Sequence, residues 1–176
     1  MSGMKPTGNL ETYDVFNPAG ERVGQATRAE VHRDPRLIHR AVHVLVWNPE
    51  GKLLLQKRGA IKDVEPGKWD TSVGGHLDAG EDWLSAARRE MKEELGVEPG
   101  ELVLLYDFRF SSPFETEDIR SFSTRHPDPF RPNPEEIEQV RFWNLTEIRR
   151  SLGSGAFSRN FEEEIRHYFS AVLPEP

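Results

Sequence analysis

The sequence contains no cysteine among its 176 residues. That absence excludes disulfide bonds, thiolate metal sites and thiol nucleophiles together. Any catalysis must therefore use oxygen, nitrogen or metal chemistry. The first ten residues also lack the apolar segment of a signal peptide. We therefore expect a cytoplasmic protein whose residues 1–10 form a disordered tail.

Long apolar runs and an excess of positive charge are missing as well. The longest apolar run, residues 41–47, is interrupted by His43 and is much shorter than the about 20 residues that cross a membrane. The 30 acidic residues outnumber the 23 basic ones, which gives a net charge of −7. This balance argues against a general nucleic-acid binder and leaves room for a metal site.

The residues that are present suit one domain over residues 11–176, since 36% of the chain is hydrophobic. An N-terminal β-hairpin extension is expected from residues 12–16 and 22–27, followed by a short helix from Ala29. Further strands are expected over residues 37–47, 52–57, 69–73, 102–110, 119–124 and 138–143. Two helices should close the chain, and the second, over residues 159–172, should have a simple apolar face.

The clearest helix covers about residues 81–95, because its apolar residues recur at spacings of three and four. These residues are Leu84, Ala87, Met91 and Leu95. The same helix places Glu90, Glu93 and Glu94 within roughly one 100° arc. Three carboxylates so close repel one another unless a cation neutralises them, and oxygen ligands suit Mg²⁺ or Mn²⁺. A solvated acidic face is the alternative.

A motif surrounds these carboxylates. It consists of Gly75, five residues, Glu81, seven residues, and then Arg-Glu-Met-Lys-Glu-Glu-Leu-Gly-Val over residues 89–97. The pattern matches the Nudix signature GX5EX7REUXEEXGU, in which U is aliphatic, at every fixed position. The chain therefore resembles the Nudix hydrolases, and we refer to residues 75–97 as the box.

The resemblance implies an α/β (α+β) Nudix fold, in which a mixed β-sheet lies between α-helices. It also implies a Mg²⁺-dependent pyrophosphohydrolase, with Mn²⁺ as a substitute, that uses metal-activated water. The substrate would be a nucleoside diphosphate or a compound linked to one. A homodimer is plausible by the same resemblance.

The family pattern also assigns roles to single residues. The implied metal ligands are the backbone carbonyl of Gly74 and the side chains of Glu81, Glu90, Glu93 and Glu94, with Glu81 acting through water. Arg89 is expected to orient Glu90 through a charge-assisted hydrogen bond. Its alternative role is a surface ion pair.

The general base and the substrate contacts are less constrained. In this family the base is either a box glutamate or a later one, for which Glu136 is the best candidate, with Glu135 and Glu138 as rivals. Arg58 and Lys57, ahead of the box, are candidates to contact the outer phosphates. All of these side chains could instead be ordinary solvated charges.

A second resemblance is to isopentenyl-diphosphate isomerase, a Nudix relative that moves a double bond. Residues 38–41, 53–58 and 66–69 carry this likeness. That enzyme holds a metal ion with three histidines and two glutamates. The matching residues here are His32, His39, His76, Glu115 and Glu117. They predict a second metal site, and ordinary polar residues are the alternative.

The isomerase also needs a catalytic cysteine just before the box, where this chain has Gly74. Because the chain has no cysteine to replace it, hydrolysis is favoured over isomerisation. A ligand sensor with a Nudix fold is a further alternative. The complete set of box carboxylates argues against it, since a sensor does not need them.

Overall fold

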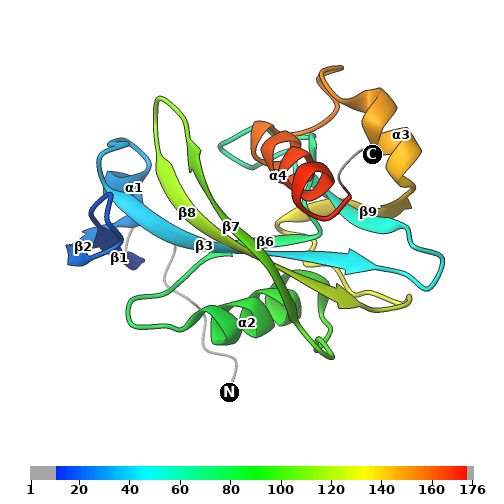
Figure 1. The fold of residues 1–176 in the computed structure, drawn as a ribbon, viewed down its shortest axis with the longest axis horizontal. Coiled ribbons are helices and arrows are strands. Elements are labelled where there is room, and N and C mark those ends of the chain that lie inside the picture. The colour runs from blue at the N-terminus through cyan, green and yellow to red at the C-terminus, as the bar shows by residue number, and fades with distance from the viewer. Residues whose placement is uncertain (1–10, 174–176) are drawn as a thin grey trace.

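The computed structural model describes residues 11–173. The expected tail over residues 1–10 lies outside the described residues. Within them, nine strands form one mixed sheet and four helices pack around it (Figure 1). Among the helices of the described residues, none is both long enough and apolar enough to cross a membrane.

The elements have the following bounds in chain order. They are β1 (Thr12–Phe16), β2 (Arg22–Thr27), α1 (Arg28–Val31), β3 (Ile38–Trp47), β4 (Leu53–Arg58), β5 (Trp69–Asp70), β6 (Val73–His76), α2 (Trp83–Leu95), β7 (Val103–Ser111), β8 (Thr116–Arg125), β9 (Ile137–Trp143), α3 (Leu145–Ser151) and α4 (Arg159–Ala171).

Strand β3 is the centre of the sheet. Strand β8 pairs with it in parallel along its whole length. The other edge of β3 is shared by β1, β6 and β4, which are all antiparallel to it. Strand β4 also pairs with β5 and β9, and β7 pairs with β8. The combination of parallel and antiparallel pairs confirms the predicted mixed sheet.

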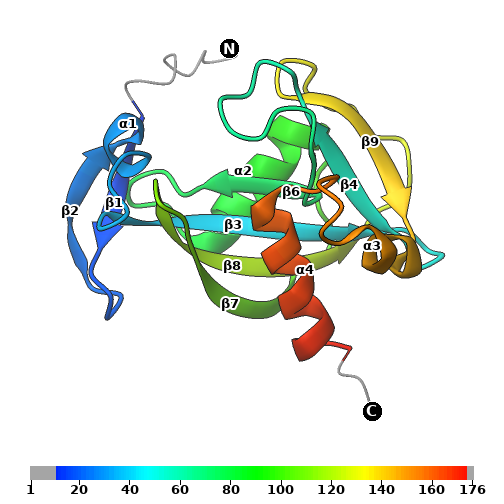
Figure 2. The same cartoon turned by 90° about the horizontal axis from the view of Figure 1, so that it is seen from above.

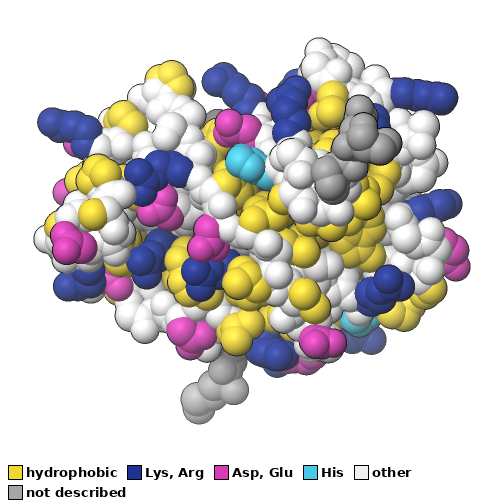
Figure 3. Space-filling view, viewed as in Figure 1, with side chains coloured by type: hydrophobic (Ala, Val, Ile, Leu, Met, Phe, Trp, Pro, Cys, Tyr) yellow, Lys and Arg dark blue, Asp and Glu magenta, His cyan; other side chains and the backbone are white. Residues whose placement is uncertain are grey.

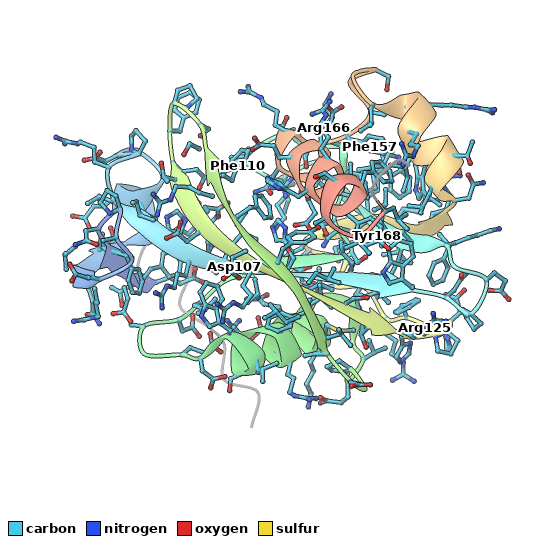
Figure 4. All side chains as sticks on the ribbon, in the orientation of Figure 1. Asp107, Phe110, Arg125, Phe157, Arg166 and Tyr168 are labelled. Carbon is cyan, nitrogen blue, oxygen red and sulfur yellow. The ribbon has the colours of Figure 1, made fainter. Side chains whose placement is uncertain are left out.

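Helices α2 and α4 lie on opposite faces of this sheet (Figures 1 and 2). Alternate residues of a strand point to opposite faces. Accordingly, Val42 and Val44 pack into the cluster that contains the apolar residues of α2. Leu45 packs into a second cluster, which contains apolar residues of α4. This cluster also includes Phe157, which is labelled in Figure 4. The central strand therefore serves two separate cores.

The segment expected as one strand over residues 69–73 forms two strands instead. The chain moves from the edge of β4 to the edge of β3 at Thr71 and Ser72. Ser72 is fully buried, accepts a hydrogen bond from the Val46 backbone (2.9 Å) and donates one to the Leu54 carbonyl. These bonds satisfy backbone groups of β3 and β4 where the chain changes partner.

Helix α4 does not have the simple apolar face that its sequence predicts. Glu164 is fully buried beside Phe161 and Ile165, while Val172 is 38% exposed. The Glu164 carboxylate accepts from Ser121 (2.9 Å) and from Tyr106, and lies 2.5 Å from His43 Nδ1. Burial opposes a charge on His43, yet the pKa of its imidazole is raised because Glu164 outweighs that effect.

The molecular face shown in Figure 3 has basic and acidic side chains interspersed over it. Apolar atoms gather near its middle, beside α4. Arg120 and Asp107 form one of its ion pairs across β8 and β7, with the Arg120 Nε atom 2.7 Å from Asp107 Oδ1. The charges on this face are therefore mixed in sign.

The fold predicts the effect of one core truncation. Ile165→Ala removes a side chain with no exposed surface from the α4 cluster, so the free energy of unfolding should fall by about 2–5 kcal/mol. Ile61→Ala is the matched control, because Ile61 is 80% exposed and should change stability by less than about 0.5 kcal/mol. Urea unfolding followed by circular dichroism measures both. Equal losses would contradict the assigned position of α4.

Candidate functional site

Helix α2 carries the box carboxylates and has a defined residue at each end. It begins after Asp82, whose side chain accepts a hydrogen bond from the Ser85 backbone. It ends at Gly96, which has a left-handed backbone with φ of 67°. A Cβ atom at Gly96 would lie 2.8 Å from Arg131. Glycine is required there both by conformation and by the close approach of the later loop.

The buried face of α2 contains carboxylates as well as apolar side chains. Met91 and Leu95 are fully buried, as predicted. Leu84 is 47% exposed, because it lies in the first turn at the exposed end of the helix, and this part of the prediction was wrong. Glu90 and Glu94 are only 8% and 6% exposed. Their charges therefore lie at the edge of the core.

Glu90 packs against the backbone of β6. A Cβ atom at Gly75 would lie 2.2 Å from the Glu90 carboxyl carbon and 2.4 Å from one of its oxygens. The absence of a side chain at Gly75 is therefore what lets the Glu90 carboxylate reach the strand. Gly75 has this function in addition to its place in the motif.

Glu94 is held by a residue that the sequence analysis missed. Gln56 Nε2 on β4 donates to Glu94 Oε2 over 2.6 Å, and the Gly74 backbone nitrogen lies 3.4 Å from the same oxygen. Burial, followed by the charges of Glu90 and Glu136, raises the pKa of Glu94 well above its ordinary value. The polar Gln56 inside the apolar run of β4 was the signal that could have identified it.

Arg89 joins the carboxylates of the box. Its Nε and Nη2 atoms donate to the two oxygens of Glu81 over 2.8 Å each, and Nη1 donates to Glu90 over 2.5 Å and to Glu93 over 3.2 Å. Nη2 also donates to the His76 carbonyl over 3.0 Å. Burial acts to lower the pKa of Arg89, but the hydrogen bonds and charges of Glu81 and Glu90 outweigh this effect. The net pKa of Arg89 is therefore raised. The guanidinium is therefore a permanent counter-charge inside the box.

The two candidate substrate contacts outside the box, Lys57 and Arg58, form ion pairs. Lys57 Nζ lies 3.0 Å from Glu138 Oε1. Arg58 Nη1 lies 2.9 Å from Asp70 Oδ2, and its Nε atom donates to the Val64 carbonyl. The roles of Lys57 and Arg58 as substrate contacts stay predictions. In this structure both cations have acidic partners.

Glu136 pairs with a cation and also acts on a carboxylate of the box. Its Oε2 atom is 3.0 Å from Lys62 Nζ, and its charge is one of those that raise the pKa of Glu94. Glu135 is exposed and precedes it in the same loop. The structure therefore brings Glu136 toward the box carboxylates, while its role as the general base stays a prediction.

The five residues of the second predicted metal site meet on the other face of β6. His32 and His39 lie 3.4 Å and 3.9 Å from Glu115 Oε2, measured from their Nε2 atoms. His76 Nε2 lies 2.8 Å from Glu117 Oε1. One ligand atom from each histidine and from Glu115 falls within 4.8 Å of the others. We call these five residues the His/Glu cluster.

Several buried atoms of the His/Glu cluster make no hydrogen bond. They are Nε2 of His32, both ring nitrogens of His39 and Oε2 of Glu115. Buried polar groups normally have partners. Burial, with the neighbouring His76, lowers the pKa of His32 to about 3, so its ring is neutral, as metal binding requires. The donors present fit a divalent ion.

Two further residues support the cluster and were missed by the sequence analysis. Asn160, at the start of α4, donates to Glu117 Oε2 over 3.1 Å. Tyr13 on β1 stacks on His39, with a centroid distance of 5.8 Å and an angle of 15° between the rings. Neither belongs to a motif, and no local signal could have identified them.

The carboxylates of the cluster have opposite pKa shifts. Burial and the Glu117 charge raise the pKa of Glu115 to about 7. Burial acts in the same direction on Glu117, but the imidazoles of His39 and His76 outweigh it and lower its pKa well below the ordinary value. The pair therefore favours a single negative charge near neutral pH when no cation is bound.

Comparison with known proteins gives consistent results. The NUDIX domain family model matches residues 37–167. An uncharacterized Nudix hydrolase of Yersinia pestis is 34% identical over 140 residues, which cover 80% of this chain and 76% of that protein. An isopentenyl-diphosphate Delta-isomerase of Streptomyces avermitilis is 33% identical over 166 residues, which cover 91% and 84% respectively.

Solved structures share the arrangement of sheet and helices. A crystal structure of a protein from Deinococcus radiodurans is 28% identical and has a TM-score of 0.78, covering 89% of this chain and 98% of that one. A protein of Methanosarcina mazei that is 21% identical has a TM-score of 0.64 over 77% of this chain. The predicted fold class is confirmed by these likenesses.

The geometry predicts that Glu94 destabilises the metal-free protein. Because its pKa is raised in the folded state, ionisation disfavours folding increasingly as the pH rises above the ordinary carboxyl pKa. Glu94→Gln should therefore raise the melting temperature at pH 8 in a chelator, and the gain should shrink at pH 5. Glu98→Gln, at an exposed position, is the control in calorimetry. A lower melting temperature at pH 8 for Glu94→Gln would contradict the raised pKa.

Proposed function

The chain belongs to the Nudix family, and from this membership we propose that it hydrolyses a phosphoanhydride bond of a nucleoside diphosphate or of a compound linked to one. The observation that carries the proposal is the complete carboxylate set on α2. Glu90 and Glu94 are buried, and Arg89 contacts both Glu90 and Glu93. Such a concentration of negative charge suits divalent cations, and a diphosphate can approach it only with their help.

The residues of the chain have separate functions in this proposal. Glu90, Glu93 and Glu94 would hold Mg²⁺, or Mn²⁺ in its place, together with the Gly74 carbonyl. When bound, the metal ions supply charge neutralisation, polarisation of the phosphorus and a lower pKa for water. Arg89 keeps Glu81 and Glu90 in position through its short hydrogen bonds. Glu136 is the proposed general base.

We also propose that the His/Glu cluster binds a second divalent ion. The buried atoms of His32, His39 and Glu115 that make no hydrogen bond support this assignment. The two sites are adjacent but separate, because Gly75 faces Glu90 on the α2 side while His76 faces Glu117 on the α4 side. Arg89 joins them through its hydrogen bond to the His76 carbonyl.

Isomerisation of isopentenyl diphosphate is the second candidate function. The likeness to isomerases named above and the assembled His/Glu cluster favour it. The chain has no cysteine, however, and Gly74 presents only a hydrogen toward His43. Without a thiol at this position, hydrolysis is the better proposal. Conversion of isopentenyl diphosphate by the purified protein would reverse this ranking.

The remaining expectations stay predictions. They are a single domain over residues 11–176, a cytoplasmic location, a small-molecule diphosphate as the partner in place of nucleic acid or membrane, and a homodimer.

Hydrolysis can be tested with a panel of nucleoside diphosphates, nucleoside diphosphate sugars and dinucleoside polyphosphates in the presence of Mg²⁺. Released phosphate and nucleotide products are measured for the wild type, Glu93→Gln and Glu94→Gln. Loss of one metal ligand should lower kcat at least about 100-fold. Glu98→Gln is the matched control, because the Glu98 side chain is exposed and follows the box in the chain. Equal turnover in all variants would contradict the mechanism.

The second metal site predicts a change in metal stoichiometry. His39→Asn should lose one bound ion per chain in equilibrium dialysis against Mn²⁺ or Zn²⁺, because both ring nitrogens of His39 lie in the buried cluster without a hydrogen bond. His126→Asn, at a half-buried position outside the cluster, should keep the wild-type stoichiometry. Glu93→Gln should retain the ion of the cluster. An unchanged ion count in His39→Asn would exclude the site.

A further inference from the structure

The loop between β4 and β5, residues 59–68, docks on the segment that precedes β9. The Gly59 backbone nitrogen donates to the Glu136 carbonyl over 2.9 Å. A Cβ atom at Gly59 would lie 3.1 Å from that oxygen. The close approach of the two backbones therefore depends on a glycine. The hydrogen bond fixes the position of the Glu136 backbone relative to the loop.

Lys62 makes a second connection between the same two segments. Its backbone nitrogen donates to the Gly59 carbonyl over 3.2 Å, which forms a turn. The turn directs the ammonium group to Glu136 Oε2 at 3.0 Å. The Lys62 side chain is 29% exposed, so this pair is partly shielded from solvent. Backbone and side chain of Glu136 are thus held by one turn.

The segment of Glu136 is also attached to the box helix. The Asn133 backbone nitrogen donates to the Glu94 carbonyl over 2.9 Å, and Glu136 and Ile137 donate back to the Asn133 carbonyl. This arrangement brings the Glu136 charge close enough to contribute to the raised pKa of Glu94, which the Lys62 charge opposes. Glu136 therefore lies in the field of the box carboxylates.

The Glu136 carboxylate is repelled by the nearby carboxylate of Glu94. Glu136 is 43% exposed on its side chain, so it could relieve this repulsion by turning toward solvent. The Lys62 ammonium opposes such a rotation because it pairs with Glu136 Oε2 at 3.0 Å, and its charge also acts on Glu94. Lys62 therefore determines the orientation of Glu136.

We propose that Lys62 is a positioning residue that holds the Glu136 carboxylate toward the box, in place to accept a proton from the attacking water. The inference rests on the proposed hydrolysis. In that step an O–H bond of water breaks and its proton passes to Glu136, while the water oxygen forms a bond to phosphorus. The bridging P–O bond breaks, and its electron pair leaves with the departing phosphate group.

The test is a double-mutant cycle on the compound of the panel that the wild type hydrolyses fastest. Lys62→Met should lower kcat about 10- to 100-fold with KM changed by less than about twofold, because the base is misplaced but substrate binding is intact. Lys62→Arg should recover kcat to within about fivefold, since it keeps the charge. In a Glu136→Gln background, Lys62→Met should cause no further loss.

Arg166→Met is the matched control. It also removes a basic side chain from an ion pair, because Arg166 Nη2 lies 3.0 Å from Glu162 Oε2, but its side chain is 55% exposed and lies on α4, outside the box. It should keep the wild-type kcat and KM. Rates are normalised to the folded fraction of each variant, measured by circular dichroism at the assay temperature.

The other outcomes separate this inference from the proposed function. A raised KM with unchanged kcat in Lys62→Met would overturn it and make Lys62 a substrate contact. Losses that multiply in the double variant would overturn it as well, because the residues would then act independently. Wild-type kcat in Glu136→Gln would overturn it while leaving hydrolysis by the box intact. Absence of turnover in the wild type would contradict the proposed function itself.

Discussion

The pairing of β6 with β3 is the interaction on which both candidate sites depend. It sets Gly74 opposite His43, Gly75 opposite Val42 and His76 opposite Ala41. Because side chains alternate along a strand, Gly75 meets Glu90 on the α2 face and His76 meets Glu117 on the other face. A slip of one residue would exchange these faces and dismantle both sites.

Negative charge is concentrated at this pairing and is balanced in a different way on each face. On the α2 face, the single guanidinium of Arg89 contacts Glu81, Glu90 and Glu93. On the α4 face, imidazoles and carboxylates share the cluster, and several of their buried atoms make no hydrogen bond. The net charge of −7 is consistent with cation binding at both sites.

Ion pairs between distant segments extend this organisation to the loops. Lys62 and Glu136 are 74 residues apart in the chain, and His43 and Glu164 are 121 residues apart. The first pair orients a carboxylate beside the box, and the second anchors α4 over the centre of the sheet. Each pair holds a carboxylate in an unfavourable environment. Glu164 is fully buried, and Glu136 is repelled by Glu94.

Local sequence determined the elements of the chain. The spacing of apolar residues predicted α2, the pattern of residues 12–16 and 22–27 predicted the β1–β2 hairpin, and the motif pointed to Glu90, Glu93 and Glu94. The predictions of α2 and of the hairpin are confirmed because they depend on residues a few positions apart, while the roles of the three glutamates stay predictions. The break between β5 and β6 was not predictable in this way, since it follows from a change of partner strand.

The contacts that make these elements into a site were decided only by the tertiary structure. Gln56 reaches Glu94 across 38 residues, and Asn160 reaches Glu117 across 43. Glu164 looks like a surface residue in its helix, yet it is fully buried because His43, Tyr106 and Ser121 surround it. Periodicity shows which residues share a face of one element. Which partners that face meets depends on strand pairing and helix packing, and these bring together residues that no local pattern connects.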